Sequence, residues 1–297
     1  MTARPFDTFL SVGDITLRVV SDDRRLASPP GGSLALFCAD HGRADVDIYA
    51  RWSDAPYDCA DRLLFDSGGV WQLHRSGGDY LFTFQSSVIG PEPYKIARFN
   101  QGFTAGDVQV YRPHFERHRF ATPFPLQYPL DELLMIHVLS QGKGVEVHGC
   151  GLLDGAGRAH VFVGQSGAGK STLARLWLDH PGVTLLSDER VVLRTDRDRI
   201  AVYGTPWQGD AHFASPLSGS LATVFFLNQA PAHAVAPTGR SLAAARLLAC
   251  SFLPFHNAAA VDATMTAVER VTRDTPCYDL WFAPDRSVID VLARHVG

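Results

Sequence analysis

Apolar and polar positions alternate with a short period through the first part of the chain. Stretches rich in β-branched and aromatic residues repeat this pattern, and each predicts a strand. The predicted strands cover residues 15–20, 45–52, 70–74, 80–85 and 107–111. Ser76, Gly77, Gly78 and Asp79 separate two of them and predict a hairpin turn. Residues 1–126 are therefore expected to form a β-rich N-terminal domain with an accessory or substrate-docking role.

The pattern changes around the prolines at positions 123–129. Beyond them, stretches with apolar residues at helical spacing also occur, so strands and helices are predicted to follow one another. The predicted strands cover 144–153, 159–163, 183–186, 191–194, 200–203, 221–227 and 278–282. The predicted helices cover 131–142, 170–180, 241–252, 258–272 and 286–295. Residues 127–297 are thus expected to form a domain of the α/β class.

Composition excludes several classes of protein. The 297 residues are 46% hydrophobic, which argues against disorder, and the net charge of −4 offers no basic field for nucleic acid or an anionic membrane. The cysteines lie far apart without a C-x-x-C pair, which disfavours a disulfide framework or a zinc site: Cys38, Cys59, Cys150, Cys250 and Cys277. No signal-peptide pattern opens the chain, and Arg246 interrupts the longest apolar run. A cytoplasmic protein without a membrane span is predicted.

One motif predicts nucleotide binding. Eight consecutive residues, followed by Thr172, fit G-x-x-x-x-G-K-[ST] at the junction of a predicted strand and a predicted helix: Gly164, Gln165, Ser166, Gly167, Ala168, Gly169, Lys170 and Ser171. Glycines allow the backbone N–H groups to surround a phosphate, and the following helix presents its positive end. Lys170 is expected to reach the β- and γ-phosphates of ATP, and the Ser171 hydroxyl to bind Mg²⁺. The choice between ATP and GTP stays open.

Acidic residues and a histidine flank this motif. Asp188 and Glu189 follow the predicted strand at 183–186, where a carboxylate could hold metal or accept the proton of an attacking hydroxyl. His148 lies in the strand that precedes the motif, and a hairpin between 144–153 and 159–163 would bring it to the phosphate end. His148 could then polarise the nucleophile or the γ-phosphoryl group, although a histidine in a strand is also an ordinary packing residue.

Taken in order, His148-Gly149, the glycine motif and Asp188 resemble the catalytic core of HPr kinase/phosphorylase. They also resemble the wider set of kinases that share its phosphoenolpyruvate-carboxykinase-like fold, including a divergent subgroup that phosphorylates lasso-peptide serines. The resemblance covers about residues 130–227. It departs from the family at Glu189, where a second aspartate is usual, and at 203–210, where the family's Glu-Ile-Arg-Gly is missing. HPr itself is therefore not the expected acceptor.

The resemblance implies an ATP-dependent kinase whose acceptor is a hydroxyl group, with a serine of a peptide or protein as the first candidate. Asp188 is expected to be the base, His148 to assist at the γ-phosphoryl group, and Ser171 and Glu189, with Asp188, to hold Mg²⁺. Residues 205–210 are either an acceptor-binding segment or a connector around a core Trp207.

Two other functions stay open. One is a kinase for a small molecule such as a metabolite or sugar, on this fold or a shikimate-kinase-like one. The other is a nucleotide-binding regulatory module without transferase activity. A homo-oligomer is compatible with each of these functions.

Overall fold

The computed structural model describes residues 5–28, 31–57, 61–88, 90–118, 124–178, 180–196 and 198–296. Cys59 and Pro123 lie outside these ranges. The chain divides into two compact units, one with Met1–Ser11 and Ile15–Leu134, the other with Val12–Asp14 and Met135–Gly297. The predicted boundary at 126/127 stays a prediction, and the division itself falls inside helix α2, Leu130–Leu139.

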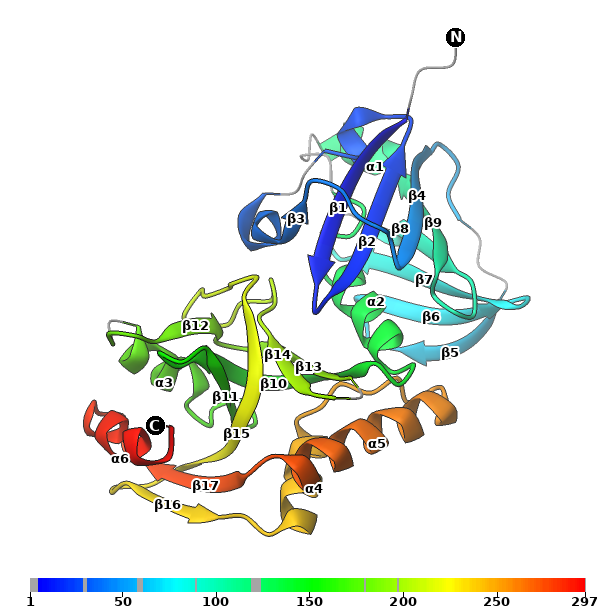
Figure 1. Cartoon of the computed structure of the whole chain (residues 1–297). Helices are drawn as coiled ribbons and strands as arrows, with labels where there is room; N and C mark the ends of the chain where they lie inside the picture. The colour runs from blue at the N-terminus through cyan, green and yellow to red at the C-terminus, as the bar shows by residue number, and fades with distance from the viewer. Residues whose placement is uncertain are drawn as a thin grey trace. The chain divides into compact units, whose positions relative to one another are not determined.

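The first unit is built on a nine-stranded sheet in the order β3-β1-β2-β4-β9-β8-β7-β6-β5 (Figure 1). Its strands are β1 Phe6–Val12, β2 Ile15–Ser21, β3 Cys38–Ala39, β4 Val46–Ser53, β5 Arg62–Asp66, β6 Trp71–Ser76, β7 Asp79–Ser86, β8 Gly90–Phe99 and β9 Ala105–Tyr111. Three short helices accompany them: η1 Arg24–Leu26, η2 Gly32–Phe37 and α1 Arg112–His118. All five strands predicted in this part are confirmed, and Ser76 pairs with Asp79 across the predicted hairpin turn.

The pattern did not predict four strands of this unit, β1, β3, β5 and β8, of which β8 is the longest. Pro91 and Pro93 lie in its first half, and prolines are unfavourable in a strand because they donate no hydrogen bond. The part of β8 that pairs with β9 begins only at Lys95, after both prolines. The backbone therefore accommodates them at the end of the strand.

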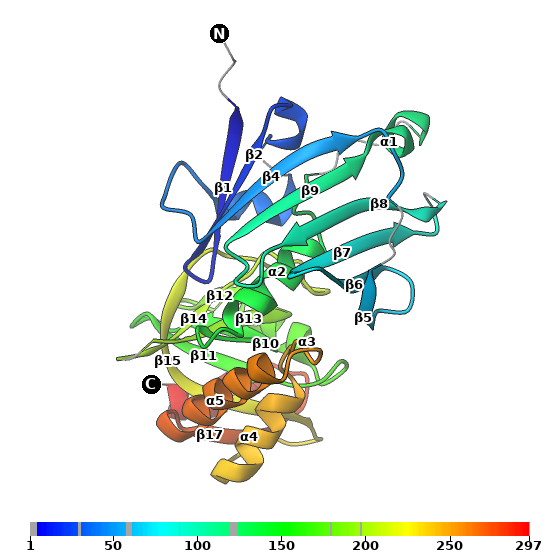
Figure 2. The same cartoon turned by 90° about the vertical axis from the view of Figure 1, so that its right-hand side faces the viewer.

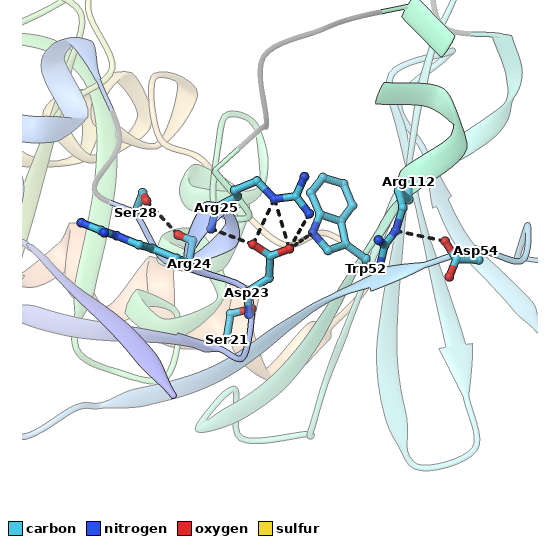
Figure 3. A network of polar contacts seen from close by, with 8 residues as sticks. All are labelled: Ser21, Asp23, Arg24, Arg25, Ser28, Trp52, Asp54 and Arg112. Atoms are coloured by element: carbon cyan, nitrogen blue, oxygen red, sulfur yellow. Dashed lines mark hydrogen bonds and ion pairs between the residues drawn. The ribbon is translucent and has the colours of Figure 1, made fainter. Parts of the chain in front are cut away.

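A polar network ties η1 to β4 (Figure 3). Asp23 caps η1 by accepting a hydrogen bond from the Arg25 backbone N–H at 2.9 Å, and it also accepts one from Trp52 Nε1 at 2.9 Å. The guanidinium groups of Arg25 and Arg112 lie 5.2 and 5.7 Å from the Trp52 ring centroid. The Arg25 guanidinium also donates to Asp23, from Nε at 3.1 Å, and these side-chain hydrogen bonds hold the pKa of Asp23 well below its usual range. Both arginines have acidic partners, since Arg112 pairs with Asp54 at 3.1 Å.

The second unit is mixed α/β and contains an eight-stranded sheet. Its strands are β10 Gly144–Leu153, β11 Arg158–Val163, β12 Thr184–Ser187, β13 Arg190–Thr195, β14 Ile200–Tyr203, β15 Ser218–Gln229, β16 Ala234–Pro237 and β17 Cys277–Phe282. Its other helices are α3 Lys170–Trp177, α4 Arg240–Ala249, α5 Ala258–Asp274 and α6 Ser287–Val296. Every predicted strand and helix is found here, and the short β16 is the strand that the sequence did not predict. Three predicted helices end early, at Leu139, Trp177 and Ala249.

Alternating side chains of the second sheet build two separate cores. Val161, Val163 and Val224 belong to a cluster with residues of α4 and α5, which lie side by side in Figures 1 and 2. Phe162 and Phe225 belong to the other cluster, with residues of α3 and α6. Because β11 pairs with both β10 and β15, the strands β11, β10, β13, β14 and β15 form a closed ring. Burial on both faces fixes β11, the strand that precedes the glycine motif, firmly in place.

No helix within the described ranges is long and apolar enough to cross a membrane.

Candidate functional site

Residues 164–169 form a glycine-rich loop between β11 and α3. Gly167 and Gly169 have φ angles of +82° and +102°, in the left-handed region that favours glycine. At Gly164, a Cβ would lie 2.6 Å from the Cβ of Ala168, so a side chain there would clash with the returning loop. These glycines are required by the local backbone, and the predicted strand–loop–helix context of the motif is confirmed.

Helix α3 begins directly after this loop, and Gly169 at its N-cap provides no side-chain hydrogen bond. The first N–H groups of a helix have no partner within the helix, and they carry the positive end of its dipole. Ser171 and Thr172 lie in this first turn and are half-buried. The N–H groups at the start of α3 can therefore donate hydrogen bonds to the oxygens of a phosphate group.

Lys170 is held inside the loop. Its side chain is almost fully buried, and Nζ donates hydrogen bonds to the carbonyl oxygens of Gly164 at 3.0 Å and Gln165 at 3.1 Å. Burial holds the pKa of Lys170 below its ordinary value, and the Glu189 carboxylate opposes this effect. The ammonium group thus lies where it can exchange these carbonyls for the stronger acceptors of a phosphate.

A cavity of about 440 Å³ opens beside the loop. Loop residues form one side of it. The end of β15 contributes Phe226, Leu227 and Gln229, and the last turn of α4 with its C-cap contributes Arg246, Ala249 and Cys250. Strands β11 and β15 are parallel, and the cavity lies at the carboxyl ends of both. Gln229 Nε2 donates to the Gly167 carbonyl at 2.6 Å and so fixes the end of β15 to the loop.

Arg246 is a cavity residue that sequence reasoning did not propose. Its guanidinium group pairs with Asp279, donates to Asn228 Oδ1 at 3.1 Å and lies 4.8 Å from the Phe226 ring centroid. Asp279 in turn accepts a hydrogen bond from Thr238 at 2.8 Å. A signal was present in the sequence, because Arg246 is the single charge that interrupts the long apolar run of this region.

His148 and Glu189 meet at the same end of the sheet. Gly149 of β10 pairs with Val163, the last residue of β11, so His148 lies level with the start of the loop. His148 Nε2 is 2.8 Å from Glu189 Oε1, and the Gly149 N–H donates to the Glu189 carbonyl at 3.0 Å. The contact with His148 is the main cause that lowers the pKa of Glu189. The hairpin prediction, which brought His148 to this end, is confirmed.

Asp188 has entirely different surroundings. It is fully buried, and its carboxylate accepts backbone N–H groups from Gly209 at 3.0 Å, Ala211 at 2.7 Å and Phe213 at 3.3 Å. Both oxygens are therefore engaged by the segment that follows β14. The predicted role of Asp188 as a base needs an oxygen that can reach an acceptor, and this arrangement favours Glu189 for that role instead.

The oxygen donors near the loop suit Mg²⁺ in kind. Mg²⁺ in kinases is commonly bound by one or two protein oxygens together with phosphate oxygens and water. Ser171 supplies a hydroxyl in the first turn of α3, and Glu189 supplies a carboxylate, whereas Asp188 is engaged as described. Within the described part of the chain, no group of three or more His, Cys, Asp or Glu side chains could hold a metal ion.

A scan against protein-family models and a search of the curated proteins both return no match for this chain. No family membership is therefore shown.

Proposed function

We propose that this protein is an ATP-dependent kinase with an HPr-kinase-like P-loop fold, which transfers the γ-phosphoryl group to a hydroxyl acceptor, with a serine of a peptide or protein as the first candidate. One observation carries the proposal. The buried amine of Lys170, the uncapped start of α3 and the His148–Glu189 pair all lie at the loop end of β10 and β11. Phosphoryl transfer needs mainly positioning and charge stabilisation, and this set supplies both.

In this proposal the loop amides and Lys170 hold the phosphates. Lys170 releases the carbonyls of Gly164 and Gln165 when a β- or γ-phosphate oxygen takes their place. Mg²⁺ bound with the nucleotide would neutralise phosphate charge, and Ser171 has the hydroxyl oxygen to hold it together with phosphate oxygens and water. The cavity beside the loop, with Arg246 in its wall, has room for the rest of the nucleotide.

Glu189 replaces Asp188 as the proposed base. The acceptor hydroxyl gives its proton to the Glu189 carboxylate while its oxygen bonds to the γ-phosphorus and the bond to the β-phosphate oxygen breaks. ADP leaves, and the proton remains on Glu189 until solvent removes it. His148 holds Oε1 of the carboxylate, which leaves Oε2 for the acceptor.

The test is a transfer assay with [γ-³²P]ATP and size-fractionated cell extract, with label followed into protein, peptide, small solutes and inorganic phosphate. We compare the wild type with Glu189→Gln and with the control Glu269→Gln, which changes an exposed glutamate of α5. Loss of a general base costs roughly 10²–10⁴-fold in rate. We expect a loss of this size in Glu189→Gln, whereas Glu269→Gln should transfer phosphate at the wild-type rate. Transfer at the wild-type rate by Glu189→Gln would contradict the assignment of the base.

A further inference from the structure

The segment 204–215, between β14 and β15, folds back over the acidic turn. The Ser215 N–H donates to the Leu186 carbonyl at 3.0 Å, and Thr205 Oγ1 donates to the Arg190 carbonyl at 2.7 Å. These bonds attach both ends of the segment to the strands that flank Asp188 and Glu189. Trp207 within it is buried, whereas Gln208, Asp210 and His212 are exposed. We refer to residues 204–215, which are attached at both ends and carry these three exposed polar side chains, as the wall.

Asp188 is the centre of this wall. Its three hydrogen bonds come from Gly209, Ala211 and Phe213, at alternate positions of one short stretch of backbone. A buried carboxylate that accepts three backbone N–H groups contributes strongly to local order, because each such bond is charge-assisted. Removing the carboxylate would leave these N–H groups without an acceptor.

The wall also touches the proposed base. At Gly209, an added Cβ would lie 2.9 Å from Asp188 Oδ2 and 2.9 Å from Glu189 Oε2. The backbone of Gly209 thus passes close to the oxygen of Glu189 that does not contact His148. An acceptor that reaches this oxygen must pass beside Gly209.

One hydrogen bond links the wall to helix α3, which follows the glycine-rich loop. Arg175 of α3 donates from Nη2 to the Asp210 carbonyl at 2.6 Å. Helix α3 is short and begins at Lys170. A shift of the helix start when the loop binds phosphate would therefore be carried by Arg175 to the middle of the wall.

We infer that Asp188 is a positioning residue: it folds residues 204–215 into a wall that places the hydroxyl acceptor beside Glu189, and Arg175 couples this wall to nucleotide binding. The inference rests on the proposed nucleotide site. It assigns the acceptor side of the site to the backbone of Gly209 and to the exposed side chains of Gln208, Asp210 and His212.

The first experiment measures hydrogen exchange of the full chain by mass spectrometry, in peptides covering 204–215. In Asp188→Asn we expect these amides to exchange about 10–100-fold faster, since a hydrogen bond to a charged group is worth about 1.5–3 kcal/mol. Peptides from α5 should keep wild-type exchange, which shows that the variant remains folded. Asp198→Asn, at an exposed site, is the matched control.

Gly209→Ala perturbs the same wall without touching the charge of Asp188. Its Cβ would press on both carboxylates, and we expect faster exchange confined to 204–215. Gly239→Ala is the control, because a Cβ there meets nothing within 4 Å. Wild-type exchange of 204–215 in both Asp188→Asn and Gly209→Ala would overturn the inference.

The second experiment tests the coupling, with the β,γ-imido analogue of ATP and Mg²⁺ as the probe. In the wild type, the probe should slow exchange in 204–215 as well as in the phosphate loop. Arg175→Ala should keep probe binding and protection of the loop but lose the added protection of 204–215, and Arg175→Lys should restore part of it. Arg273→Ala, an exposed arginine of α5, is the control.

The outcomes separate the two proposals. Absence of probe binding by the wild type in calorimetry would remove the proposed function itself. Probe binding with equal protection of 204–215 in the wild type and Arg175→Ala would leave the kinase proposal intact and overturn the coupling.

Discussion

Asp188 and Glu189 are adjacent in the chain, but their carboxylates have different partners. Both were expected beside the phosphates because they follow a buried strand. Successive side chains point to different sides, and which one faces the loop depends on where β12 ends. In the structure Asp188 turns to the backbone of 209–213, and Glu189 turns to His148. The presence of two carboxylates here was predictable from the sequence. Which of them is buried depends on residues 209–213, which lie some twenty positions later in the chain.

Lys95 is a buried residue whose charge makes stability depend on pH. Burial lowers its pKa from the ordinary 10.5 to about 7, and its Nζ donates to the carbonyls of Pro125 and Gln127. Between pH 7 and 10.5 the unfolded chain binds a proton that the folded chain does not, so stability rises with pH in this window. Below it both forms are protonated, and the cost of burying the charge is constant.

We therefore predict that the free energy of unfolding of the wild type rises relative to that of Lys95→Met from pH 7 upward. The slope should approach about 1.4 kcal/mol per pH unit for one proton. Urea unfolding of both proteins at pH 6, 7, 8 and 9 measures the difference. A difference that stays constant over this range would show that the Lys95 pKa is not lowered.

At the scale of elements, the strand–loop–helix unit could be predicted almost completely. The motif, the apolar strand before it and the helical spacing after it are all local signals, and β11, residues 164–169 and α3 follow them. The cavity wall could not be predicted in the same way. Arg246 and Cys250 reach it only because α4 returns to the end of β15, a contact between positions distant in sequence.

The start of α3 should be intolerant of side chains at Gly169. Its φ is +102°, and a Cβ would lie 2.7 Å from Cζ of Phe282. We expect Gly169→Ala to lower stability by at least about 1–2 kcal/mol, the usual cost of a left-handed residue with a Cβ, and to weaken ATP binding. Gly155→Ala, in the turn between β10 and β11 and without a positive φ, is the control in thermal unfolding. Equal stability of the two variants would argue against this loop geometry.

Alkylation of Cys250 can report whether a nucleotide occupies the cavity, without any measurement of activity. It lies in the cavity wall, and burial raises its pKa, so alkylation should be run near pH 9. With free MgATP at nine times its Kd, alkylation of Cys250 should slow about tenfold, while that of Cys38 in the first unit stays unchanged. Peptide mass spectrometry measures both rates. Unprotected Cys250 under these conditions would place the nucleotide elsewhere.

At the scale of the whole molecule, the two units differ in how far local pattern determines them. The β-rich character of the first unit follows from alternation, but its strand order does not. Strands β2 and β9 pair with β4 in parallel, which requires connections that local periodicity does not specify. The closing pair β11–β15 of the second unit is equally non-local. The proposed chemistry lies entirely in the second unit.

The central claim is that residues 164–172 bind a nucleoside triphosphate through Lys170. Calorimetric titration of MgATP into the wild type and Lys170→Ala tests it most directly, with thermal unfolding as the check that both proteins are folded. We predict one site in the wild type and an affinity roughly 10–100-fold weaker in Lys170→Ala, since each lost charge-assisted hydrogen bond is worth about 1.5–3 kcal/mol. Equal affinity of the two folded proteins for MgATP would contradict the claim.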